Sequence, residues 1–162
     1  MSENNRDGDE PIFTALSHKN AAMNAAFAQA ARSIPRFIEH LQSGADAYCA
    51  AKLRFRDPDE SERLGQDRFI YLWMGMAQYH SEERVFSGAF FELPKELEKW
   101  HHLGQRLAFD GEDIFDWMVI TQDGRLFGGY TLRVSRNELP ESERADYDSY
   151  IGVRSYEPEQ ET

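Results

Sequence analysis

The sequence predicts an α+β fold: a strongly coiled antiparallel sheet or a small SH3-like barrel, with a leading amphipathic helix and a C-terminal helix. Apolar residues recur at three- and four-residue steps over 21–41, as they do on one face of a helix. Between 45 and 134, strand-like runs are joined by short polar turns, which leave no room for the crossover helix that parallel strands need. After Pro140, acidic residues crowd the first turn of a last helical segment, as the helix dipole prefers.

The leading helix should contain a break. Pro35 cannot donate a backbone hydrogen bond, so we expect a kink or a restart near Ser33, and we expect Gly44 to end the helix. The opposite, polar face should point to water, and it carries Arg32, Arg36, Glu39 and His40.

The strands are expected next. Residues 48–56 alternate between apolar and polar or basic positions, which is typical of a strand with one buried face. The following segment, 57–66, is polar and is predicted to be a loop. The run at 68–79 is apolar on both faces and should be a central strand, and Gly75 within it indicates a bend or bulge. Further strands are predicted at 84–93 and 105–109, with a short helical turn over 94–103 between them.

The clearest local signal is Asp123-Gly124 between two apolar runs, which is typical of a two-residue hairpin turn. The register set by such a turn places Trp117 opposite Tyr130 as a cross-strand aromatic pair.

A pair of glycines, Gly128 and Gly129, falls inside the second strand of this hairpin. Glycine weakens a strand, so we expect the pair to serve a bulge, a sharp coil or the close approach of another backbone. The C-terminal helix is predicted to open at Leu139-Pro140 and to end near Tyr150.

Composition is typical of a cytoplasmic globular protein with charged ends. The chain has 162 residues, of which 41% are hydrophobic. We expect a single α+β domain over 17–154, a flexible acidic tail over 1–16 and a frayed acidic tail over 155–162. The sequence contains neither an apolar run of about 18 residues nor a signal peptide, and Cys49 has no partner for an intrachain disulfide, so we expect a cytoplasmic location.

The net charge of the chain restricts the classes of partner that it is expected to bind. A formal charge of −11 argues against nucleic acid and against anionic membranes, because both require clustered Lys and Arg. It favours solubility or a basic protein partner. Phosphate-binding loops are missing from the sequence, and the adjacent His101 and His102 would not point at one metal ion, so we expect neither a cofactor nor a metal.

Two motifs resemble a known family. The Asp-Trp-Met motif at 116–118 and the Gly-Gly-Tyr-Thr motif at 128–131 resemble the C-terminal signature of the YegJ-like family of bacterial domains of unknown function. The resemblance covers roughly residues 22–135 and implies a compact domain with no established activity and no catalytic residues to carry over. This chain departs from shorter members in its 57–67 loop and in its 135–162 tail.

One candidate pocket lies near the hairpin and comprises Asp116, Trp117, Tyr130 and Arg133. Asp116 beside Trp117 is a candidate for acid–base chemistry. The alternative interpretation is that Asp116 accepts backbone hydrogen bonds where its strand begins, or pairs with Arg133 or Arg125.

The candidate partner surface is acidic, with tyrosines as anchors, and comprises Glu112, Asp113, Glu141, Glu143, Asp146, Tyr147 and Tyr150. Our leading hypothesis is a non-enzymatic protein-binding module, in one version an immunity-type inhibitor that neutralises a basic toxin. The alternative is a small-molecule-binding domain, or an unrecognised enzyme, with its pocket near Trp117 and Tyr130. The sequence specifies neither the partner nor the oligomeric state.

Overall fold

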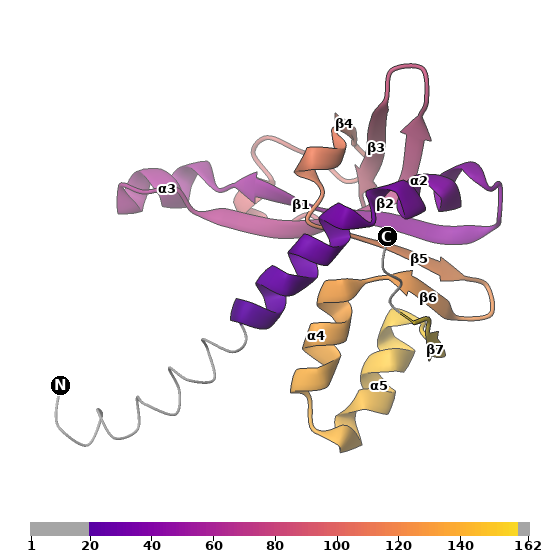
Figure 1. Ribbon diagram of the computed structural model, residues 1–162. Helices are drawn as coiled ribbons and strands as arrows, with labels where there is room; N and C mark the ends of the chain where they lie inside the picture. The colour runs from indigo at the N-terminus through magenta and orange to yellow at the C-terminus, as the bar shows by residue number, and fades with distance from the viewer. Residues whose placement is uncertain (1–19, 159–162) are drawn as a thin grey trace, which may run out of the picture.

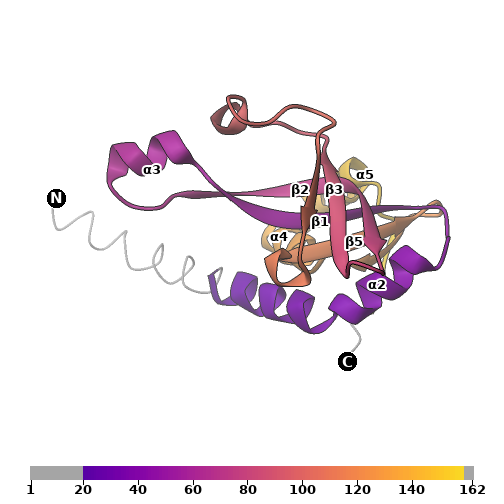
Figure 2. The same ribbon diagram turned by 90° about the horizontal axis from the view of Figure 1, so that it is seen from above.

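A mostly antiparallel sheet separates two layers of helices in the computed structural model, which describes residues 20–158 (Figures 1 and 2). Within those residues the strand order is β4-β3-β2-β1-β5-β6-β7, and every neighbouring pair is antiparallel except β6 and β7. The strands are β1 (Ala47–Arg56), β2 (Phe69–His80), β3 (Val85–Phe90), β4 (Arg106–Phe109), β5 (Asp116–Thr121), β6 (Arg125–Gly128) and β7 (Ser155–Tyr156). The predicted α+β class and antiparallel pairing are confirmed, and the sheet is open, with β4 and β7 at its edges, rather than closed into a barrel.

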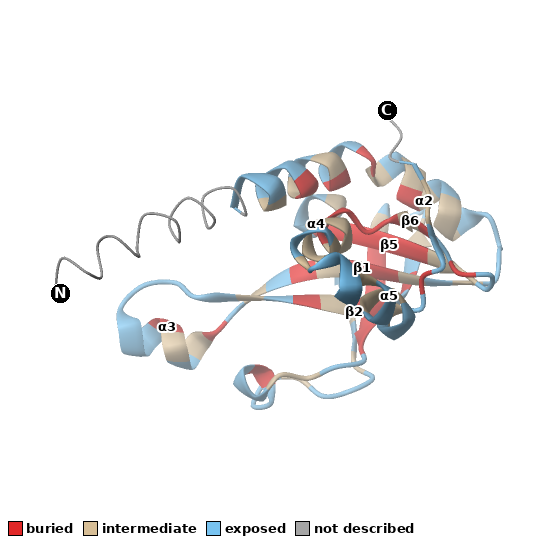
Figure 3. Cartoon of the chain, turned by 90° about the horizontal axis from the view of Figure 1, so that it is seen from below, coloured by how far each residue is buried: buried red, intermediate tan, exposed pale blue. Residues whose placement is uncertain are grey.

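One face of the sheet is covered by the first helix, residues 20–32, and by α2 (Ile34–Gln42). The predicted break is confirmed, because Ser33 separates the two helices and Pro35 lies in the first turn of α2, where its missing N–H costs little. The main core lies beneath α2, where Phe37 stacks against Phe86 and Trp117 with ring centroids 5.8 and 5.2 Å away. Figure 3 shows the buried residues concentrated on the central strands.

The opposite face is covered by α4 (Tyr130–Glu138) and α5 (Glu141–Ile151), which form a helical hairpin (Figure 1). The predicted α5 is confirmed, but the prediction that the second hairpin strand continues to about 134 is wrong. The chain leaves the sheet at Gly128 and Gly129, whose φ values are +70° and +63°. A Cβ at Gly128 would lie 2.5 Å from the Trp117 carbonyl oxygen, so this exit is closed to other residues.

The turn between β5 and β6 differs from the prediction by one residue. The observed partners are Val119 with Phe127 and Ile120 with Leu126, so three residues, rather than two, form the loop and Trp117 is not the strand partner of Tyr130. Two hydrogen bonds to Thr121 hold the loop. The Thr121 carbonyl accepts one from the N–H of residue 124, and the Thr121 hydroxyl accepts one from the N–H of residue 125. A three-residue hairpin loop with glycine in its last position, here at φ +86°, is a common alternative.

The prediction of a loop over 57–66 is also wrong, because this segment forms α3 (Pro58–Leu64) at the far end of the β1–β2 ribbon (Figure 1). The Asp57 side chain accepts a hydrogen bond from the Glu60 N–H at 3.1 Å and caps the helix, Pro58 occupies its first turn, and Gly65 ends it at φ +69°. The remaining helical turns are η1 (Lys95–Leu97), within the predicted turn, and η2 (Gly111–Asp113).

The C-terminal segment is attached to the sheet as far as it is described. Residues 155–158 lie against the sheet, because β7 pairs in parallel with β6 and the Glu157 N–H donates a hydrogen bond to the Leu126 carbonyl at 2.9 Å. The tail predicted at 1–16, and residues 159–162, lie outside the described residues. In the described part of the chain, none of the helices is long and apolar enough to cross a membrane.

Candidate functional site

Asp116, the first residue of β5, is fully buried and organises the start of α4. Its Oδ1 accepts from the N–H groups of Trp117 and Tyr130 at 2.8 and 3.2 Å. Its Oδ2 accepts from the N–H and hydroxyl of Thr131 at 2.8 and 2.6 Å. The N-cap residue of α4, Gly129, has no side chain, so a carboxylate from a neighbouring strand caps the helix in its place.

Lys52 completes this buried network. It is the strand partner of Asp116, and its Nζ donates to the Thr131 hydroxyl at 3.0 Å. Burial raises the pKa of Asp116 to about 6, against the opposing effects of the Thr131 hydrogen bonds and the Lys52 charge. Burial also lowers the pKa of Lys52. Asp116 is therefore an ionised group at neutral pH whose described hydrogen bonds are internal; it does not pair with Arg133 or Arg125, and the arrangement favours a structural role over acid–base chemistry.

A cavity of about 280 Å³ lies nearby, between α2, β6 and the start of α4, and we term it the arginine cavity. Its lining residues are Arg36, Glu39, His40, Trp117, Arg125, Phe127, Gly128, Tyr130, Arg133, Glu157 and Pro158. The structure thus brings together three of the four residues of the predicted pocket, Trp117, Tyr130 and Arg133, while Asp116 does not line the cavity. The Trp117 and Tyr130 rings meet edge-to-face at 6.0 Å.

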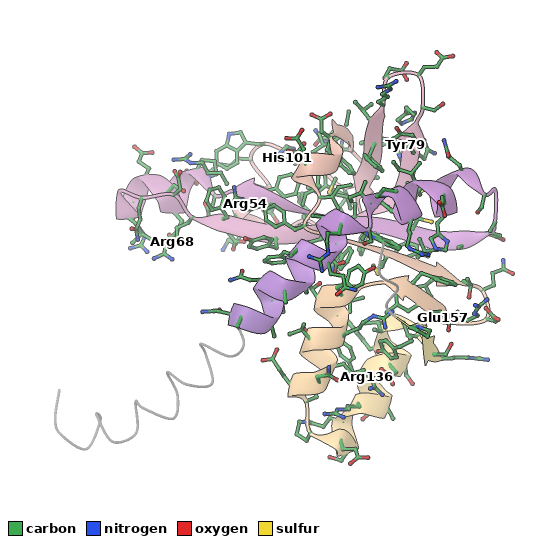
Figure 4. The ribbon with its side chains drawn as sticks, in the orientation of Figure 1. Arg54, Arg68, Tyr79, His101, Arg136 and Glu157 are labelled. Atoms are coloured by element: carbon green, nitrogen blue, oxygen red, sulfur yellow. The ribbon has the colours of Figure 1, made fainter. Side chains whose placement is uncertain are left out.

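The arginines of the cavity are held in different ways. Arg133 donates from Nε to the Gly128 carbonyl at 3.0 Å and from Nη2 to that of Leu126 at 3.3 Å. Arg125 pairs with Glu157, at 2.6 Å from Nη2 and 3.1 Å from Nε to one carboxylate oxygen. Figure 4 labels Glu157 at this edge of the sheet. Among the described residues, the buried Nε of Arg36 has no hydrogen-bond partner.

Three residues of this cavity, Arg36, Glu39 and His40, were expected to face water. Glu39 is exposed, but the expectation is wrong for Arg36 and His40, which are partly buried. His40 is half-buried, and its ring packs 4.6 Å from that of Phe127 and 5.9 Å from that of Trp117. Burial lowers the pKa of His40, the Glu39 charge raises it and the Arg36 charge lowers it further. Arg36 and His40 are one helical turn apart and share a face of α2, which is the one signal in the sequence that could have placed them together.

A second hollow, of about 600 Å³, lies between the sheet and the α4–α5 hairpin, and we term it the aromatic groove. It is lined by Tyr48, Trp73, Phe91, Glu92, Met118, Ile120, Leu132, Tyr147, Tyr150 and Ile151. Tyr150 is 86% exposed, Phe91 47% and Tyr48 41%. Tyr147, by contrast, is half-buried and donates its hydroxyl hydrogen bond to the Leu132 carbonyl, so it holds α5 against α4.

The aromatic groove depends on a glycine of β2. A Cβ at Gly75 would lie 2.8 Å from the Tyr48 hydroxyl and 2.9 Å from the Phe91 ring. These two rings therefore lie directly over the backbone of β2, edge-to-face with centroids 6.2 Å apart. The predicted irregularity at Gly75 is confirmed by a register shift between it and Gln78.

The predicted partner surface is divided by the sheet. Glu112 and Asp113 lie in η2, which is beside α2, because a Cβ on the neighbouring Gly111 would contact Ile34. The α5 residues of that surface lie on the other side of the sheet. Glu143 precedes Tyr147 by one helical turn and Asp146 likewise precedes Tyr150, so these carboxylates share faces of α5 with the tyrosines that line the groove. Glu141, in the first turn of α5, is also exposed.

The described residues contain no cluster of three or more His, Cys, Asp or Glu side chains that could hold a metal ion.

Comparison with known proteins finds one family model that matches most of the chain. The family model described as an uncharacterized protein conserved in bacteria (DUF2314) matches residues 20–154. The match includes α4 and α5, so it extends beyond the roughly 22–135 over which a family resemblance was expected. A protein of Neisseria meningitidis serogroup B, named as an ankyrin repeat protein, is 27% identical over 96 residues. The match covers 59% of this chain and 37% of that protein, and no solved structure matches.

Proposed function

This chain belongs to the DUF2314 family, and we propose that it is a protein-binding module that holds a basic polypeptide segment in the aromatic groove. The observation that carries the proposal is the exposure of aromatic rings around an apolar hollow. Tyr150 and Phe91 are among the most exposed large hydrophobic side chains of the described residues. Apolar hollows with exposed aromatic residues are typical of binding surfaces, where Tyr and Trp act as anchors.

The proposed partner is basic because the groove and its margin are acidic. Glu92 lines the groove, and its charge, after burial, contributes to raising the pKa of Tyr48. On α5, Glu143 and Asp146 lie one turn from the groove tyrosines. A segment with Lys or Arg beside one apolar anchor would satisfy both features, and charge would speed its encounter with this acidic chain.

The comparisons are compatible with this proposal. The matched region forms 37% of the Neisseria relative, so in that protein it accompanies other sequence, as binding modules commonly do. The motifs at 116–118 and 128–131 support a closer grouping of this chain with the YegJ-like proteins. An immunity-type inhibitor is the specialised form of the proposal, and it adds the requirement that binding abolish the activity of a basic toxin.

The test is fluorescence anisotropy with dye-labelled synthetic peptides that combine several Lys residues with one Leu, Phe or Trp. Matched peptides replace either the Lys residues by Glu or the apolar residue by Gly. We expect binding to require both features and to weaken as salt rises from about 50 to 300 mM. Tyr150→Ser should raise the Kd by about tenfold or more.

Trp100→Ser is the matched control, because Trp100 is 47% exposed but does not line the groove. It should leave the Kd within about twofold of the wild-type value. Equal losses in the two variants, or binding that ignores peptide charge, would contradict the proposal.

A further inference from the structure

We propose that the aromatic groove continues past Tyr48 into a neighbouring hollow, which we term the end hollow. Together they take an extended polypeptide segment of about seven residues, with a basic residue at each end and apolar residues between. This inference rests on the proposed function, because it uses the same groove, and it specifies which basic segment the groove selects.

The end hollow has a volume of about 470 Å³ and adjoins the aromatic groove. Both are lined by Tyr48, Ile120 and Ile151, so they share a wall. Tyr48 and Ile120 are strand partners in β1 and β5, and Ile151 is the last residue of α5. A chain that lies in the aromatic groove can therefore continue over this common wall into the end hollow.

The strand register gives the length of the combined groove, because Ala51 of β1 lies opposite Met74 of β2, and Met74 lies opposite Phe90 of β3. Asp46 lines the end hollow and precedes Ala51 by five residues. Glu92 lines the aromatic groove and follows Phe90 by two residues. Since β1 and β3 both run antiparallel to β2, the two carboxylates are about seven residue steps apart, on the order of 20 Å along the strands.

Each end of the combined groove carries a carboxylate. Asp46 and Glu92 are both exposed, and among the described residues neither hollow is lined by a Lys or Arg side chain. Asp46 accepts a hydrogen bond from the Gln122 amide, which leaves most acceptor positions of its carboxylate available. Arg154, which follows α5, packs against Gly124 and lines neither hollow. Both ends are therefore suited to a cation.

The C-terminal end of α5 adds to the negative charge of the end hollow. Gly152 caps the helix, is exposed and lines this hollow. The last turn of α5 carries no basic residue. Because the carbonyl end of a helix carries a partial negative charge that a cation offsets, the end hollow favours a Lys or Arg side chain more strongly than Asp46 alone would.

The surface between the two ends is apolar and includes Tyr48, Trp73 and Ile120. A helix that spanned the same length, about 10 Å across, would occupy roughly 1,600 Å³, which exceeds the volume of the two hollows together. An extended chain is narrower, and its alternate residues point to the same side. The groove therefore favours an extended segment whose first and last inward-facing residues are basic and whose inner ones are apolar.

The test compares two peptides of identical composition, Lys-Ser-Leu-Ser-Leu-Ser-Lys and Lys-Lys-Ser-Leu-Ser-Leu-Ser, with blocked termini. Each is titrated into the ¹⁵N-labelled full chain at about 50 mM salt, where screening is weak. The indole N–H signal of Trp73, which lines the groove, reports binding. We expect the peptide with separated Lys residues to bind at least about threefold more tightly, because only it reaches both carboxylates.

Three variants test the two ends. Asp46→Asn and Glu92→Gln should each raise the Kd of the peptide with separated Lys residues by about two- to fivefold. Only one of these two variants should weaken the peptide with adjacent Lys residues. Glu82→Gln makes the same charge change at an exposed position that lines neither hollow, and it should bind both peptides like the wild type.

Equal Kd values for the two peptides, or equal effects of Asp46→Asn and Glu82→Gln, would overturn this inference while leaving the aromatic groove as a binding site. Tighter binding by a peptide of about 14 residues that places the same charges at helical spacing would also overturn it, because the bound segment would then be a helix. If neither peptide binds and the Trp73 signal does not move, the proposed function fails as well.

Discussion

On the face of the sheet covered by the first helix and α2, large rings pack into a continuous core. Phe37 and Trp117 are almost completely buried there and stack on each other. On the face covered by α4 and α5, the buried cluster consists of smaller contributions from Ala50, Met118, Leu126 and Val153, and the aromatic groove remains open beside it. The difference indicates that stability comes mainly from the first face, whereas the second leaves an apolar hollow open to solvent.

The largest expected effect comes from a matched pair of truncations, one on each face. Phe37→Ala should lower the free energy of unfolding by about 4 kcal/mol, because it removes a fully buried ring from the stack with Phe86 and Trp117. Tyr150→Ala, at an 86% exposed position, should change it by less than about 0.5 kcal/mol. Urea unfolding measures both changes in the free energy of unfolding. Similar losses of stability in the two variants would contradict the conclusion that the first face supplies most of the stability.

A second test concerns the exit from β6 that joins the two faces. Gly128→Ala places a Cβ 2.5 Å from the Trp117 carbonyl oxygen at a φ of +70°, so it should destabilise the protein by about 3–4 kcal/mol. Gly152→Ala has a similar φ of +78° but open space around it, and it should cost about 1 kcal/mol. If the two variants unfold at the same urea concentration, crowding at residue 128 is not what requires glycine.

The buried network around Asp116, under α4, should make the free energy of unfolding depend on pH. The pKa of Asp116 is about 6 in the folded protein and near its usual value of 3.8 when unfolded. The folded state therefore binds this proton more tightly, so the contribution of Asp116 to stability is fully present below about pH 4 and is lost as pH rises through 6. The wild-type free energy of unfolding, relative to Asp116→Asn, should fall by about 2.4 kcal/mol between pH 4 and pH 7.

Urea titrations of both proteins at the two pH values provide this difference. A relative stability that instead rises with pH would mean that the four hydrogen bonds to the carboxylate, together with the Lys52 charge, outweigh its burial.

The smallest effect is expected outside both faces, at α3. Asp57→Ala removes the side chain that caps the helix, and it should cost about 1 kcal/mol. Glu62→Ala is a control in the same helix, at an exposed position without a capping role, and it should be nearly neutral. A loss of more than about 3 kcal/mol in Asp57→Ala would indicate that α3 supports the sheet rather than extending from it.

The elements that could be predicted from the sequence are those with local causes. The helix break follows from Pro35, and β1 and β2 follow from their apolar patterns. The local signals for α3 are present in the sequence, namely Asp57, Pro58 and Gly65. The polar composition of 57–66 nevertheless favoured a loop in the prediction. The residues after Gly129 fit a strand or a helix equally well, and close packing against Trp117 decides between them.

The candidate sites could be predicted in part for the same reason. Trp117, Tyr130 and Arg133 are near enough in sequence to be grouped by one hairpin. Arg36 and Glu157 come from opposite ends of the described chain. Both line the arginine cavity because α2 lies across the sheet and because β7 pairs with β6, and neither arrangement has a local sequence signal.

The Trp117 indole N–H donates a hydrogen bond to the Ser33 hydroxyl at 2.9 Å, so the fluorescence of Trp117 should report on the contact between the helices and the sheet. This hydrogen bond ties the break in the helical layer to the centre of the sheet, and Trp117 is 1% exposed. Trp73 lines the aromatic groove on the other face, and Trp100 is half in solvent. Versions of the chain that keep one tryptophan at a time would let emission wavelength follow undocking of the helices and occupation of the groove as separate events.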